Sequence, residues 1–153
     1  MSEPLAIVLA AGKGTRMNSD NPKVLCEALG RPLIDYVLDA LSSAQVGRMV
    51  VVVGYQADRV QEHLDGRAGL EFVEQKKQLG TGHAVMVCRE QLAGHTGPVL
   101  VVAGDSPLLQ VRSVTKLLNA FRQGHPACLL GTLHKGDPTG LGRIVRDEEG
   151  NFV

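Results

Sequence analysis

The sequence has no excess of charge of either sign. Its 153 residues carry 16 Lys and Arg against 16 Asp and Glu, a formal net charge of +0 at pH 7. A chain without net charge creates no general field that would draw it to nucleic acid or to an anionic membrane surface. We therefore expect no nucleic-acid partner and no membrane partner, and basic residues should matter only where they cluster locally.

Long hydrophobic runs and regularly spaced cysteines are also missing. No apolar run approaches the roughly 20 residues of a membrane-spanning helix, and the start Met1–Pro4 lacks the positive charge of a secretory signal. The three cysteines are odd in number and have no metal-ligand spacing; they are Cys26, Cys88 and Cys128. Free thiols in a cytoplasmic protein are the expected state.

The chain contains no internal repeat, low-complexity tract or linker, and its 44% apolar content is enough for one core of single-domain size. Apolar runs predict strands at Leu5–Leu9, Arg48–Val53, Leu70–Glu74, Val99–Ala103, Ala127–Thr132 and Arg143–Arg146. Amphipathic stretches predict helices at Leu33–Leu41, Ala57–Leu64, His83–Leu92 and Ser113–Phe121. This alternation predicts an α/β fold, a Rossmann-like and mostly parallel sheet with helices on both faces and ligands at the carboxyl ends of its strands.

The residues after the first strand have the composition of an anion-binding loop. Gly12 and Gly14 allow backbone N–H groups to approach an anion without a Cβ in the way. Positive charge comes from three residues, Lys13, Arg16 and Lys23. The spacing fits neither a P-loop, which has four residues between its glycines, nor a dinucleotide fingerprint, whose third glycine would stand at Met17. The loop predicts room for a nucleoside triphosphate; the alternative is a glycine-rich turn with solvated basic residues.

Asp105 is the strongest candidate for a metal ligand. It follows the apolar run Val99–Ala103 and Gly104, so it should emerge at the end of a strand. Mg²⁺ prefers oxygen ligands and usually takes one or two from protein carboxylates. The alternatives are that Asp105 caps a helix beginning near Gln110 or closes a turn with Ser106. The five histidines have no i, i+4 pair of the kind that binds zinc and are expected to be structural or surface residues.

Four motifs in a fixed order resemble a known family. They are Leu9–Met17 followed by Pro22–Lys23, then Gln78–Ala84, Gly104–Leu108 and Asp137–Ile144. These motifs resemble the sugar-nucleotide pyrophosphorylases, the nucleotidyltransferases that make nucleotide sugars, and among them the bacterial N-acetylglucosamine-1-phosphate uridylyltransferases. The Ala10–Ala11 pair departs from the Ala-Gly-Gly that is usual in glucose-1-phosphate thymidylyltransferases, which favours the uridylyl branch.

The resemblance implies an in-line attack of N-acetylglucosamine 1-phosphate on the α-phosphate of UTP, which yields UDP-N-acetylglucosamine and pyrophosphate with Mg²⁺ on Asp105. It implies catalytic charge neutralisation by Arg16 and Lys23. It implies nucleotide or substrate contacts at Leu9, Ala10, Ala11, Gly12, Lys13, Gly14, Thr15, Gln75, Gly80, Thr81, Gly104 and Gly142.

Three of these assignments have plain structural alternatives. Gln75 can contact uracil through its amide, but a solvated residue at a strand end would look the same. Thr81 can be a helix N-cap. Gly142, placed near the amino sugar by the resemblance, can be a turn glycine.

The chain departs from the family pattern at Ala103, where tyrosine is common, at Ser106, where an apolar residue is usual, and at Cys26, where histidine is common. Sugar identity therefore stays open. The alternatives are another hexose 1-phosphate, another nucleotide, or a non-catalytic nucleotide-sugar sensor. A cytidylyltransferase is not expected to carry the Gln78–Gly82 segment.

The carboxyl terminus suggests a hairpin with one arm missing. The expected strand Arg143–Arg146 runs into the polar turn Asp147–Asn151, and two residues follow. We expect residues 1–153 to be the nucleotide-binding amino-terminal part of an incomplete nucleotidyltransferase domain, with further metal ligands beyond Val153. By themselves they should be inactive and should associate with other copies through the open edge at Arg143–Arg146.

Overall fold

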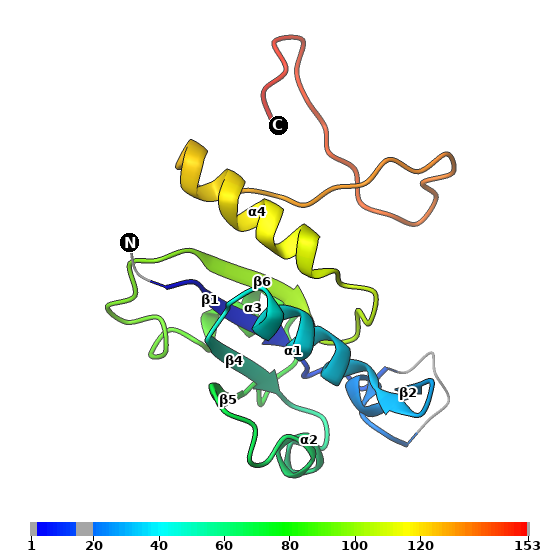
Figure 1. Ribbon diagram of the computed structural model, residues 1–153. Helices are drawn as coiled ribbons and strands as arrows, with labels where there is room; N and C mark the ends of the chain where they lie inside the picture. The colour runs from blue at the N-terminus through cyan, green and yellow to red at the C-terminus, as the bar shows by residue number, and fades with distance from the viewer. Residues whose placement is uncertain (1–2, 15–19, 153) are drawn as a thin grey trace.

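The computed structural model describes residues 3–14 and 20–152. Four parallel strands form its central sheet in the order β5-β4-β1-β6 (Figure 1). Their bounds are Leu5–Leu9 for β1, Arg48–Val53 for β4, Leu70–Glu74 for β5 and Val99–Ala103 for β6. All four agree with the strands predicted from the sequence, and the sheet confirms the predicted parallel α/β fold.

Burial on both faces explains why the two central strands are almost wholly apolar. The register pairs Val8 of β1 with Val51 of β4 and with Val102 of β6. Residues 5–8 and 50–53 are completely buried. A parallel sheet needs helices on both faces to achieve this, and its strands then appear in the sequence as continuous hydrophobic runs.

Helices cover the two faces unequally. On one face, α1 (Leu33–Ser43), α2 (Ala57–His63) and α4 (Val111–Gly124) contribute to one apolar cluster with side chains from β1 and β4. On the other face, α3 (Thr81–Met86) contributes Ala84 to a smaller cluster. The observed α3 is shorter than the predicted helix His83–Leu92; it starts two residues earlier and is followed by turns. The observed α4 is longer than the predicted helix Ser113–Phe121 at both ends.

The smaller face is open along β6. Val99 and Val101 point to the side of the sheet that carries Leu5 and Ile7, and they are 41% and 45% exposed. A strand at the end of a sheet with an exposed apolar face is a surface that another element can cover.

The predicted strands at Ala127–Thr132 and Arg143–Arg146 do not form. Residues 127–145 run as an exposed chain without strand pairing, seen beyond α4 in Figure 1. Only the tip of the predicted hairpin exists, where Arg146 bridges Phe152 and the N–H of Asp147 donates to the carbonyl of Asn151 (3.0 Å). Apolar composition alone does not make a strand, which also needs a partner strand and a surface to bury its side chains. The edge strands of the sheet are β5 and β6, and Arg143–Arg146 is not part of the sheet.

A short hairpin and a 3-10 turn, neither predicted from the sequence, precede α1. The turn η2 (Lys23–Leu25) leads into β2 (Glu27–Ala28) and β3 (Arg31–Pro32), which pair antiparallel. The two residues between them, Leu29 and Gly30, have φ values of 53° and 74°. Two positive φ values suit the tight turns that join strands in hairpins.

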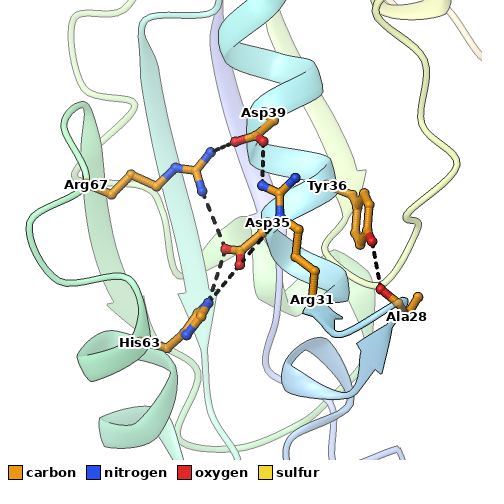
Figure 2. A network of polar contacts seen from close by, with 7 residues as sticks. All are labelled: Ala28, Arg31, Asp35, Tyr36, Asp39, His63 and Arg67. Carbon is orange, nitrogen blue, oxygen red and sulfur yellow. Dashed lines mark hydrogen bonds and ion pairs between the residues drawn. The ribbon is translucent and has the colours of Figure 1, made fainter.

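A network of charged side chains fastens this hairpin to α1 and α2 (Figure 2). Asp39 of α1 accepts from both Arg31 and Arg67. One turn earlier on α1, Asp35 contacts Arg67 (3.4 Å) and His63 of α2 (3.1 Å). Burial alone would raise the pKa of Asp39, but the hydrogen bonds from Arg31 and Arg67 outweigh it and the pKa is lowered.

Candidate functional site

Three loops meet at the carboxyl ends of the strands and enclose a cavity of about 400 Å³. They follow β1, β5 and β6. The residues that line the cavity are Leu9, Ala11, Gly12, Lys23, Val24, Gln75, Gln78, Gly80, Thr81, Ala84, Ala103 and Asp105. This volume lies within the range of small-ligand sites, and the end of a parallel sheet is where such sites form.

Most of the residues implicated by sequence lie at this cavity. Eight of them line it: Leu9, Ala11, Gly12, Lys23, Gln75, Gly80, Thr81 and Asp105. Ala10 and Gly104 are buried and are each flanked in the sequence by two lining residues. Thr15 and Arg16 lie outside the described residues. Gly142 does not line the cavity, because it belongs to the exposed chain after α4 and no strand carries it to the sheet.

The loop after β1 is held by hydrogen bonds to the Ala11 carbonyl and leaves Gly12 open. The carbonyl of Ala11 accepts from the N–H of Tyr55 (3.2 Å) and from Nε2 of Gln78 (2.7 Å). A Cβ at Gly54 would lie 2.9 Å from the Cβ of Ala11, so only glycine allows the end of β4 to come this close. A Cβ at Gly12 would meet no atom within 4 Å. The loop is therefore fixed from one side and accessible from the other.

Lys23 and Asp105 form an ion pair at the rim of the cavity. Their side chains are 41% and 24% exposed, so both remain accessible to a ligand. Gly104 brings Asp105 into place: its N–H donates to the carbonyl of Leu9 (2.9 Å), and a Cβ there would lie 3.1 Å from that oxygen. The N-cap of α4 is Gln110, without a side-chain cap, so the alternative of Asp105 as a helix cap is wrong.

Lys23 is itself tightly positioned by the loop after β1. Gly14 has φ +69°, and a Cβ there would lie 2.7 Å from the Cβ of Lys23. Glycine is required at this position both for the left-handed backbone and for the close approach. The turn η2 begins beside it, with the N–H of Leu25 donating to the carbonyl of Pro22 (2.8 Å).

Gln75 is 4% exposed, so the alternative of a solvated strand-end residue is wrong. Its Nε2 donates to the carbonyl of Gly80 (3.1 Å) and lies 3.0 Å from Nδ1 of His83. Because a carbonyl can only accept, the atom facing Gly80 must be the amide nitrogen. Gln75 thus holds the turn at Gly80, whose φ is +96°, and leaves its amide oxygen as the group it can offer a ligand.

Sequence reasoning missed three contributors to the site. Gln78, which the sequence motif contains but to which it assigns no function, donates a hydrogen bond to the carbonyl of Ala11. Nδ1 of His83 is the second partner of the Gln75 side-chain amide. The Tyr55 ring lies under Lys13, whose Nζ is 5.2 Å from the ring centroid. No spacing rule would have found them, since each acts across residues distant in sequence or through a turn that only the fold creates.

The remaining titratable groups offer little chemistry. Within the described ranges, no group of three or more His, Cys, Asp or Glu side chains converges on a metal-sized position. The three cysteines are free thiols, as predicted, and burial raises the pKa of Cys88. In the same ranges no helix is long and apolar enough to cross a membrane.

The fold and the site define the class: an α/β protein whose strand ends place a glycine-rich loop, a lysine and a carboxylate around one ligand-sized cavity. Solved structures share the fold. A nucleotidyl transferase from Methanothermobacter matches with a TM-score of 0.67 and 25% identity, covering 78% of this chain and 58% of that one. A putative glucose-1-phosphate thymidylyltransferase from Bacillus anthracis has a TM-score of 0.70 at 18% identity, covering 78% of this chain and 50% of that one.

The chain belongs to the family described as the MobA-like NTP transferase domain, whose family model matches residues 6–147. Among curated proteins, the bifunctional protein GlmU of Listeria welshimeri is 45% identical over 150 residues, covering 98% of this chain and 32% of that protein. GlmU of an Exiguobacterium strain is 44% identical over 151 residues, covering 99% of this chain and 33% of that protein. The nucleotidyltransferase family predicted from the four motifs is confirmed. The chain spans about a third of the length of these relatives.

Proposed function

We propose that the chain is the nucleotide-binding part of a uridylyltransferase that converts UTP and N-acetylglucosamine 1-phosphate into UDP-N-acetylglucosamine and pyrophosphate. The observation that carries the proposal is the Lys23–Asp105 pair, which lies beside the open Gly12 loop at the rim of the cavity. A cation and a carboxylate in this position suit a ligand that brings both phosphate and a metal ion. The similarity to GlmU and the uridylyl-type motifs support the choice of nucleotide.

The reaction needs positioning and charge neutralisation rather than acid–base catalysis. A phosphate oxygen of the sugar phosphate attacks the α-phosphorus of UTP, and the bond to the departing pyrophosphate breaks on the opposite side. Lys23 leaves Asp105 for the phosphate oxygens, and Arg16 provides a second positive charge with a geometry that matches phosphate. Lys13 and Gly14 contribute backbone N–H groups to the same loop.

Asp105 fits the role of a Mg²⁺ ligand. It is the cavity-lining carboxylate of the described residues, and Mg²⁺ commonly binds one or two carboxylates together with substrate phosphates and water. The bound ion would supply charge neutralisation across the nucleotide phosphates. Because Lys23 forms an ion pair with Asp105, the carboxylate is fully available to a metal ion only when Lys23 binds phosphate oxygens of the nucleotide instead. Triphosphate and metal should therefore bind cooperatively.

The uracil ring is assigned to the Gln75 side of the cavity. The amide oxygen of Gln75 can accept from the single N–H of the ring, while backbone N–H groups at Gly80 and Thr81 can donate to its carbonyls. Ala103 lines the same cavity with a side chain much smaller than the tyrosine common in the family, so the sugar preference is less constrained than the base preference. The cytoplasmic location and a homo-oligomeric state stay predictions from the sequence.

The test is pyrophosphate release by the complete protein, assayed with four nucleoside triphosphates against several sugar 1-phosphates in the presence of Mg²⁺. We expect UTP and a hexosamine 1-phosphate to give the highest turnover. Equal or greater turnover with CTP or dTTP would overturn the uridylyl assignment. Binding of UDP-sugar without any turnover would favour the nucleotide-sugar sensor instead.

A further inference from the structure

The segment that leads from β4 into α2 contacts the loop around Lys23 at two separate points. On one side, the Tyr55 ring lies under Nζ of Lys13 at 5.2 Å. On the other, Nη2 of Arg59 donates to Oδ1 of Asn21 (2.8 Å). Both contacted residues are close to Lys23 along the chain or through a neighbour. Lys13 precedes Gly14, where a Cβ would lie 2.7 Å from the Cβ of Lys23, and Asn21 precedes Lys23 by two positions.

Gln56 connects these two contacts. Its Nε2 donates to the Tyr55 hydroxyl (3.2 Å), and its Oε1 accepts from Nη1 of Arg59 (2.8 Å). The Arg59 guanidinium thus uses one nitrogen for Gln56 and the other for Asn21, an arrangement that a lysine ammonium on a flexible stem does not reproduce.

The backbone of Gln56 is in an unfavourable conformation. It has φ 49° and ψ 47°, the left-handed region that non-glycine residues rarely occupy. Such residues persist where surrounding contacts fix them, and they are concentrated near functional sites. This residue joins Tyr55 to the start of α2, so its conformation lies between the two side chains that contact the loop.

The geometry points to Arg59 as a positioning residue that sets the place of Lys23 opposite Asp105. Arg59, supported by Gln56, holds Asn21 at the entry to η2, so that Lys23 leaves the turn toward the cavity. Tyr55 holds the Lys13–Gly14 segment that packs on the Lys23 side chain. This role rests on the proposed function, because the purpose of placing Lys23 is to meet the triphosphate.

The first experiment needs no ligand. Amide hydrogen exchange is measured on the complete protein for peptides that report residues 12–14 and 20–25, in wild type and in Arg59→Ala. An exposed hydrogen-bonded contact of this kind is weak, so we expect exchange there to be about fivefold faster in the variant. Arg48→Ala is the matched control: it removes an exposed arginine that pairs with Glu71 at the opposite end of β4, and exchange in both regions should be unchanged. Unchanged exchange in Arg59→Ala would overturn the positioning role of Arg59.

The second experiment separates positioning from general stability. The value of kcat/KM for the triphosphate is measured for Arg59→Ala, Arg59→Lys, Lys23→Ala and the double variant Arg59→Ala/Lys23→Ala. We expect a loss of about fivefold in each Arg59 variant and no further loss when Arg59→Ala is added to Lys23→Ala. An undiminished effect in the Lys23→Ala background would show that Arg59 does not act through Lys23. Absence of turnover in the wild type would instead refute the proposed function, and the exchange result would still decide whether Arg59 positions the loop around Lys23.

Discussion

At the scale of single residues, glycines decide how closely the strand ends can approach one another. Gly54 and Gly104 let the ends of β4 and β6 approach the loop after β1, where a Cβ would meet atoms of Ala11, Leu9 or Val24. Gly14 likewise lets the loop after β1 come close to Lys23, whose Cβ would lie 2.7 Å from a Cβ at this position. The sequence predicted the glycine-rich loop from its composition, but these contacts depend on neighbours distant in sequence.

Gly104→Ala tests the close approach that places Asp105. The new Cβ would lie 3.1 Å from the carbonyl oxygen of Leu9 and 3.2 Å from Cγ1 of Val24, so β6 or the turn must shift. We expect the free energy of unfolding to fall by about 1–3 kcal/mol, measured by denaturant titration. Gly136→Ala is the control, because a Cβ there meets nothing within 4 Å. Equal stability of the two variants would contradict the packing described for the end of β6.

At the scale of elements, the four strands were predictable because each is a short apolar run that the fold buries. The same rule failed for Ala127–Thr132, whose apolar residues find no partner strand and remain exposed. The β2–β3 hairpin was missed because each strand has only two residues.

Asp105 and the loop after β1 were predicted to converge because parallel strands end at one edge of the sheet. The sequence did not predict the Lys23–Asp105 pair or the Arg59–Asn21 contact. Both join side chains from segments that are distant in sequence, and only the fold brings such segments together.

The charged network between the hairpin, α1 and α2 should make stability depend on acid pH. In the folded protein the pKa of Asp39 lies below its usual 3.8, so its contribution is complete above that pH and is lost as the pH falls through the folded pKa. Asp39→Asn should therefore lower the free energy of unfolding at pH 7 by about 0.5–1 kcal/mol, a modest amount because the side chain is half exposed.

Chemical denaturation at a series of pH values measures this dependence. The difference between wild type and Asp39→Asn should shrink as the pH falls below 3.8. Glu90→Gln, which neutralises an exposed carboxylate elsewhere, should follow the wild-type curve throughout. A difference that stays constant down to the lowest pH would mean that the charge of Asp39 is not what stabilises the network.

At the scale of the whole molecule, the described residues combine a buried pair of central strands with an exposed edge strand, β6. Val99 and Val101 of β6 are exposed on the apolar side of that edge. We expect residues 1–153 alone to bind uridine nucleotides weakly, to turn over little or no substrate, and to self-associate in sedimentation experiments as concentration rises.

Val101→Lys tests whether β6 is the associating surface. A charge on the exposed face of an edge strand opposes pairing with another copy, so the variant should remain monomeric at concentrations where the parent associates. Leu133→Lys is the control, since it places the same charge on an exposed residue of the chain after α4. Association that persists in Val101→Lys and disappears in Leu133→Lys would assign the surface to the carboxyl-terminal segment.

The proposed function requires Asp105 and Lys23 to form the phosphate and metal side of a nucleotidyl-transfer site. The most direct measurement is pyrophosphate release from UTP and N-acetylglucosamine 1-phosphate by the complete protein and its Asp105→Asn variant, as a function of Mg²⁺ concentration. Wild-type turnover should rise with Mg²⁺, and the variant should lose about 100-fold or more while unfolding cooperatively near the wild-type midpoint. Near-normal turnover of a folded Asp105→Asn variant at ordinary Mg²⁺ concentrations would contradict the assignment of Asp105 as the Mg²⁺ ligand.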